Sequence, residues 1–149
     1  MYIFEFRRFH RVRGYDLYLY LVKEHKMKSI YCIMSIQLLT RNDLEAALQE
    51  NVGILFIKFG ASWCAPCRQI EPYLEEKKKI LPHNAIYIEI DVDESIDLYA
   101  FLKRKKMVQG IPALLCYIKG NTSYVPDEFV SGTNIETLDQ FFKTCLESL

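Results

Sequence analysis

The sequence lacks a long apolar run, an excess of either charge and a high cysteine content. No uncharged stretch exceeds twelve residues, as between Ser29 and Thr40, and a membrane-spanning helix needs about 20 apolar residues. The 19 basic side chains balance 19 acidic ones, so the net charge gives no reason to expect nucleic acid or a membrane as a partner. Five cysteines in 149 residues are too few, and odd in number, for a secreted disulfide scaffold. We therefore expect a protein of a reducing compartment, the cytoplasm.

Charge is unevenly spread along a chain whose length suits one domain. Residues 1–33 carry seven basic and three acidic side chains, a net charge of +4, and residues 34–149 carry twelve and sixteen, a net charge of −4. We place a boundary at Met34, between a basic N-terminal extension of unknown role (1–33) and a folded domain (34–149). The extension lacks the apolar stretch and the small-residue cleavage site of a secretory signal. Organelle targeting and a partner-binding arm are both open alternatives for it.

Strand-like and helix-like patterns alternate after Met34. Thr40 and Thr133 each precede an acidic residue by three positions, the spacing of a capping box, and predict two helix starts. Further helices are expected at residues 65–81 and 94–105. Strands are expected at residues 36–39, 52–59, 85–91, 111–119 and 128–131, the last two as an antiparallel hairpin. Apolar residues should lie near one face of the last helix: Ile135, Leu138, Phe142, Cys145, Leu146 and Leu149. This order predicts an α/β sandwich with a mixed central β-sheet flanked by helices.

The clearest chemistry lies in Cys64 and Cys67, which enclose Ala65-Pro66 at a predicted strand-to-helix junction. Free backbone N–H groups and the helix dipole stabilise a thiolate at a helix N-terminus, and the thiolate is the nucleophilic form of cysteine. Cys67, one turn further on, can close a disulfide or resolve a mixed disulfide by attacking Cys64. Pro66 suits the first turn, where an N–H would have no partner.

Cysteines can also serve as metal ligands or as structural residues. A zinc site would need a second pair of ligands, and the remaining cysteines and His83 show no such pairing, so we expect no metal. An unreactive structural C-x-x-C is a further alternative. Cys116, in an apolar strand, and Cys145, on an apolar helix face, are expected to be small core residues.

The residues around the cysteine pair carry a family resemblance. The segment FGASWCAPCR at 59–68, with Pro72 after it, resembles the active-site segment of thioredoxins. The segments IDVD at 90–93 and GIPAL at 110–114 resemble two further thioredoxin segments, in the same order. The similarity covers about residues 36–149. It implies a thioredoxin-like fold for this domain.

The resemblance also implies roles by position. Cys64 matches the attacking nucleophile and Cys67 the resolving cysteine of a redox-active disulfide, and Pro112 matches the cis-proline that faces it. Trp63 matches the tryptophan beside the dithiol, and Gly132 a glycine that keeps the substrate groove open. The substrate-binding positions implied are Trp63, Ala65, Pro66, Ile111, Pro112 and Gly132.

Three residues depart from the family pattern. Ala113 replaces a threonine, and Ala65 replaces a glycine between the cysteines, which leaves the reduction potential open. Lys58 stands where the family usually has a buried aspartate that helps to deprotonate the resolving cysteine, so Lys58 is a candidate modulator of the cysteine pKa values. We expect Lys58 to pair with Glu89, because a buried unpaired ammonium is costly. The alternative is that the Lys58 ammonium reaches solvent.

These observations favour a thiol–disulfide oxidoreductase that reduces protein disulfides. Its partners would be disulfide-containing proteins and, as electron donor, a thioredoxin reductase or a glutathione system. No bound cofactor is expected, since the two cysteines are the redox couple. The alternatives are a more oxidising oxidase or isomerase of the same fold, and a redox-inactive binding module.

Overall fold

The most apolar predicted strand lies at the centre of the sheet. The structure, a computed structural model, describes residues 40–149; the predicted strand at 36–39 and the extension at 1–33 lie outside this range. Strand β1 (Ile54–Gly60) is flanked by β2 (Ala85–Asp91) and β3 (Ala113–Ile118), and β4 (Glu128–Ser131) follows at the edge, in the order β2-β1-β3-β4. The β1/β2 pair is parallel, whereas β1/β3 and β3/β4 are antiparallel. The predicted mixed sheet and its terminal hairpin are confirmed.

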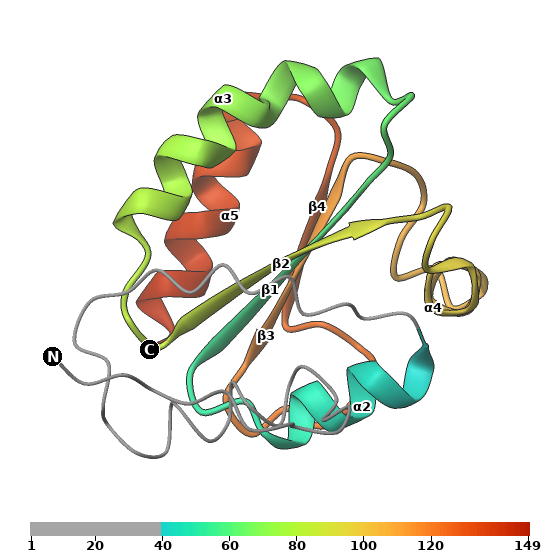
Figure 1. The fold of residues 1–149 in the computed structure, drawn as a ribbon. Coiled ribbons are helices and arrows are strands. Elements are labelled where there is room, and N and C mark those ends of the chain that lie inside the picture. The colour runs from blue at the N-terminus through green and yellow to red at the C-terminus, as the bar shows by residue number, and fades with distance from the viewer. Residues whose placement is uncertain (1–39) are drawn as a thin grey trace, which may run out of the picture. The chain divides into compact units, whose positions relative to one another are not determined.

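Helices cover both faces of this sheet (Figure 1). Helices α3 (Ala65–Ile80) and α5 (Ile135–Glu147) lie on one side, and α2 (Arg41–Gln49) and α4 (Ile96–Arg104) on the other. Two helical layers explain why residues 54–59 of β1 are all buried, since a strand covered on both faces is apolar in both directions. Within residues 40–149, no helix is long and apolar enough to cross a bilayer.

The main core lies between the sheet and the α3/α5 layer. Alternate residues of β1 point to this layer, and Ile54 and Phe56 belong to a buried cluster with residues of β3, β4, α3 and α5. On the opposite face, the ring of Phe59 lies 5.8 Å from that of Tyr99 in α4. Lys58 has the same parity as Ile54 and Phe56. Its side chain therefore leaves β1 toward α3.

Helix starts show where local patterns succeed and fail. The Thr40 side chain accepts a hydrogen bond from the backbone N–H of Asp43, and the Asp43 carboxylate accepts one from the N–H of Thr40, so the predicted capping box is present. The second predicted box is wrong. Asn134 caps α5 by accepting from the N–H of Thr137, because asparagine is itself a strongly preferred N-cap residue and the helix begins one residue later than a cap at Thr133 would set it.

The buried face of α5 also differs from the expected one. Leu138, Phe142 and Cys145 are buried as predicted, and Phe141 joins them. Ile135 and Leu149 are exposed instead. Ile135 is the first residue of α5, and Leu149 lies past its last residue, Glu147.

Gly53, just before β1, is packed against the backbone of Asn84, in the connection between α3 and β2. A Cβ atom at Gly53 would lie 2.0 Å from the backbone oxygen of Asn84, which accepts a hydrogen bond from the N–H of Ile54 at 3.2 Å. We expect Gly53→Ala to lower the free energy of unfolding by about 1–3 kcal/mol, the usual cost of overpacking. Urea unfolding measures this. Gly110→Ala is the control, because a Cβ there would have no atom within 4 Å, and an equal loss in both variants would contradict the argument.

Candidate active site

Cys64 and Cys67 lie at the start of α3 and form a disulfide. Cys64 is the N-cap residue, and its Sγ accepts a hydrogen bond from the backbone N–H of Cys67 at 3.2 Å. Both cysteines are nearly buried, at 3% and 5% exposure, whereas Ala65 and Pro66 between them are exposed. Pro66 occupies the first turn of the helix. The pair thus has the helix N-terminal setting that stabilises a thiolate at Cys64.

The segment between β1 and α3 is held by backbone contacts. The N–H of Cys64 donates to the carbonyl of Ala61 at 3.1 Å, and the Arg68 guanidinium donates to the carbonyl of Ser62 at 2.7 Å. Gly60, the last residue of β1, accepts from the N–H of Val92 at 3.0 Å. The turn that carries the cysteines is therefore tied to the ends of two neighbouring parallel strands.

Trp63 stands outside this turn and is 63% exposed. Its indole N–H donates to the Asp93 carboxylate at 2.7 Å, and the Asp91 carboxylate accepts from the N–H of Asp93 at 2.8 Å. These contacts orient the ring beside Cys64 without burying it. The sequence alone assigns Asp93 no role beyond the family segment IDVD, although its position just past the end of β2 places it near the start of the dithiol turn.

Pro112 and Gly132 meet beside the dithiol turn. The Ile111–Pro112 peptide bond is cis, as the resemblance implied. Ala113 pairs with Phe59 in the sheet register, so Pro112 lies at the end of β1 from which the dithiol turn departs. The N–H of Gly132 donates to the Pro112 carbonyl at 3.0 Å. Gly132 has a φ of +94°, and a Cβ there would have no atom within 4 Å, so the space above it is open.

Lys58 lies under the dithiol and is almost fully buried. Its side chain is 7% exposed, which excludes the alternative that the ammonium extends to solvent. A Cβ atom at Gly60 would lie 3.6 Å from Cys67 Sγ and 3.8 Å from Lys58 Cε. The missing side chain of Gly60 therefore leaves one small space that both Lys58 and Cys67 border.

The main partner of Lys58 differs from the expected one. Its ammonium contacts the carboxylate of Glu71 in α3 directly. Glu89, its register partner on β2, lies at 4.0 Å, the outer limit of an ion pair. Glu71 was missed, although it follows Cys67 by four residues on one helix and so shares its face.

The Lys58–Glu71 pair continues into a larger ionic cluster. Lys78 contacts Glu75 and lies 2.8 Å from Glu89 and 4.0 Å from Glu71. Burial lowers the pKa of Lys78, but its hydrogen bonds to Glu75 and Glu89 outweigh this and raise it. The three carboxylates lie close enough to surround a cation, yet two ammonium groups already pair with them. The cluster is therefore an ion-pair network that runs from Lys58 along α3.

Cys116 and Cys145 are fully buried free thiols. The hydrogen bond between them, followed by burial, raises the pKa of Cys116. A thiol with a raised pKa stays protonated and unreactive at neutral pH. The expectation that these two cysteines are core residues is confirmed.

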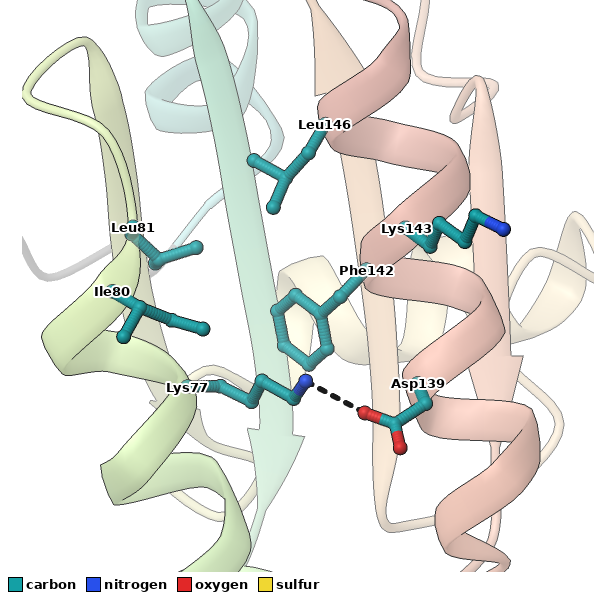
Figure 2. Close-up of a pocket in the computed structure, with 7 residues that line it drawn as sticks. All are labelled: Lys77, Ile80, Leu81, Asp139, Phe142, Lys143 and Leu146. Carbon is teal, nitrogen blue, oxygen red and sulfur yellow. Dashed lines mark ion pairs between the residues drawn. The ribbon is translucent and has the colours of Figure 1, made fainter.

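A cavity of about 290 Å³ lies between the C-terminal end of α3 and α5 (Figure 2). Ile80, Leu81 and Phe142 point into it, and the ion pair of Lys77 with Asp139, at 2.6 Å, closes one side. Most of α3 separates this cavity from Cys67, which is about 20 Å at 1.5 Å per residue. The cavity is not part of the dithiol site.

A family model described as thioredoxin matches residues 35–144 of the chain. A thioredoxin from Ictalurus punctatus is 33% identical over 110 residues, which are 72% of this chain and 94% of that protein. A thioredoxin H-type from Ricinus communis is 37% identical over 73 residues, 42% of this chain and 61% of that protein. The first three curated relatives are each matched over only 51–65% of their length.

Solved structures agree with this fold. The structure of Fasciola hepatica thioredoxin superposes with a TM-score of 0.57 and 28% sequence identity, over 72% of this chain and 96% of that one. A Plasmodium falciparum thioredoxin structure gives a TM-score of 0.55 at 24% identity, over 73% and 84% of the two chains, which supports the fold alone.

Proposed function

Because the chain belongs to the thioredoxin family, we propose that it is a thiol–disulfide oxidoreductase that reduces disulfides in proteins. The observation that carries this proposal is the Cys64–Cys67 disulfide at the N-terminus of α3. A nearly buried pair at a helix start combines a stabilised thiolate with a second thiol in reach of it. The two cysteines supply both electrons, so the cycle needs no bound cofactor.

The proposed cycle has two thiol–disulfide exchanges. In the dithiol form, the Cys64 thiolate attacks one sulfur of a substrate disulfide and forms a mixed disulfide with it, and the other substrate sulfur leaves as a thiolate and takes up a proton. Cys67 then loses its proton and attacks Cys64 Sγ, which releases the second substrate sulfur and closes the Cys64–Cys67 disulfide. The substrate gains two electrons and two protons, and the protein loses them.

We assign the substrate groove to the exposed surface around this disulfide. Trp63, Ala65 and Pro66 present exposed side chains next to Cys64, and the open space above Gly132 lies beside Pro112. An extended substrate peptide can hydrogen-bond to the backbone of Ile111, next to Pro112, while the disulfide of the substrate faces Cys64. Such backbone recognition suits a protein that acts on many disulfide-containing partners.

A thioredoxin reductase or a glutathione system would return the two electrons to Cys64 and Cys67. We place this cycle in the cytoplasm, because a reducing compartment keeps the dithiol form populated. The main proposal is therefore that the protein reduces substrate disulfides and does not form them.

The buried Lys58 favours a second candidate, an oxidase or isomerase. A cation next to a thiolate stabilises the dithiol form and raises the reduction potential. Lys58 is 7% exposed and shares the space over Gly60 with Cys67. Its direct contact with Glu71 opposes this effect, which is why reduction is preferred here.

The reduction potential of the Cys64–Cys67 pair tests the two directions. The protein is equilibrated in graded glutathione buffers, and its free thiols are counted by alkylation. We expect a value of about −270 mV, typical of a reductant of this fold, whereas a value of about −120 mV is typical of a strong oxidant. The reduced protein should also reduce insulin faster than a matched concentration of free dithiol. A pair that stays oxidised, or stays reduced, across all buffers would contradict the proposed function.

A further inference from the structure

We propose that Glu71 is a positioning residue that sets the redox equilibrium of the Cys64–Cys67 pair by holding the Lys58 ammonium. This inference rests on the proposed thiol–disulfide function and adds a residue from α3 to it. The proposed contact of Glu71 is with Lys58 and not with a substrate or with the reacting sulfur atoms. It acts through Lys58, whose positive charge would otherwise stabilise the thiolate form of the dithiol.

The Lys58 side chain contacts a carboxylate and borders the same small space as a sulfur atom of the dithiol. Its side chain leaves the middle of β1 toward α3, and only 7% of it is exposed. A Cβ atom at Gly60 would lie 3.8 Å from the last side-chain carbon, Cε, and 3.6 Å from Cys67 Sγ, so both atoms border the same space. The ammonium, one bond further on, contacts Glu71. Rotation about the Cδ–Cε bond, one bond earlier, moves the ammonium and so changes how near the positive charge lies to the sulfur.

The charge of Lys58 matters because the site is shielded from water. A positive charge within about 4–6 Å of an acidic group such as a thiol stabilises the ionised form. It raises the acid dissociation constant of that group by about ten- to thousandfold. A stabilised thiolate favours the dithiol over the disulfide, so an uncompensated Lys58 makes the pair more oxidising. The Glu71 carboxylate compensates that charge locally, which keeps the dithiol a better reductant.

Glu71 suits this role better than its two acidic neighbours. Glu89 lies at 4.0 Å from the Lys58 ammonium and makes a closer contact, at 2.8 Å, with Lys78. Glu75, one turn further along α3, pairs with Lys78. Glu71 and Cys67 are four residues apart on α3 and project to the same side. The helix that begins at the dithiol therefore also carries the carboxylate that neutralises the buried cation.

The test compares Glu71→Gln with Glu75→Gln, which removes the same charge from the same helix. Each variant is equilibrated with glutathione at one pH, and alkylation measures the ratio of dithiol to disulfide. We expect Glu71→Gln to move this equilibrium about tenfold toward the dithiol, which is about 30 mV more positive. Glu75→Gln should stay within about a third of that shift in millivolts, since its partner is Lys78. Thermal unfolding of both variants monitors folding.

A Lys58→Met background separates the action through Lys58 from a direct one. If Glu71 acts by holding the ammonium, Glu71→Gln has no further effect once the ammonium is gone. An unchanged equilibrium in Glu71→Gln, an equal shift in Glu75→Gln, or a full shift in the Lys58→Met background would each overturn the inference. A wild-type pair that does not cycle at all would instead overturn the proposed function, so the two failures are distinguishable.

Discussion

We expect Cys64→Ser to lose disulfide-reducing activity down to the uncatalysed background, and Cys67→Ser to stop halfway with the substrate attached. Cys64 is the N-cap of α3 and accepts the N–H of Cys67, a setting that stabilises a thiolate. A serine hydroxyl at this position has no comparable tendency to ionise, and it cannot form a disulfide. Cys67→Ser keeps the attacking thiolate but removes the thiol that releases the substrate.

The measurement is turnover of insulin, followed by a search for mixed disulfides on non-reducing gels. Cys67→Ser should give a covalent adduct that dithiothreitol removes, and Cys64→Ser should give none. Cys145→Ala serves as a control, because this thiol is fully buried outside the site. A Cys64→Ser, Cys67→Ser double variant with undiminished turnover would disprove the cysteine cycle. A double variant that kept its partners but lost turnover would have the properties of a binding module.

The second large effect is expected on stability. Phe56, in the middle of β1, has no exposed surface, and its ring centroid lies 6.0 Å and 5.2 Å from those of Phe141 and Phe142 in α5. Phe56→Ala should lower the free energy of unfolding by about 3–5 kcal/mol, because the transfer free energy is lost and a cavity stays behind. Since domains are stable by only about 5–15 kcal/mol, such a loss threatens folding at growth temperature.

Urea unfolding provides the value, and Phe129→Ala provides the comparison. Phe129 lies on the edge strand β4 and is 57% exposed, so its truncation should change the free energy by less than about 1 kcal/mol. If Phe56→Ala fails to fold, the more conservative Phe56→Leu should still show a clear loss. Equal and small effects at both phenylalanines would contradict the assignment of β1 as the centre of the core.

Predictions that depend on neighbouring residues and predictions that depend on tertiary packing agree with the structure to different degrees. The C-x-x-C pair at a helix start, the cap at Thr40 and the strands predicted within residues 40–149 depend on neighbours within a few residues, and they are present, with strand ends shifted by up to two residues. The strand predicted at 36–39 lies outside the described residues. The cap at Asn134 was missed because two adjacent polar residues can both serve a helix start. Phe141 was missed because the buried stripe of α5 depends on how the helix lies on the sheet.

The sequence by itself determined the fold class, the position of the dithiol at a helix start and the family to which the chain belongs. These follow from residue periodicity and from a motif whose chemistry lies within one helical turn. Only the tertiary structure decided where the buried charge of Lys58 is neutralised. Its partner Glu71 is 13 residues away along the chain, and its competition with Glu89 and solvent depends on how α3 packs over β1. A charge is paired by distance in space, and that distance is set only when the layers come together.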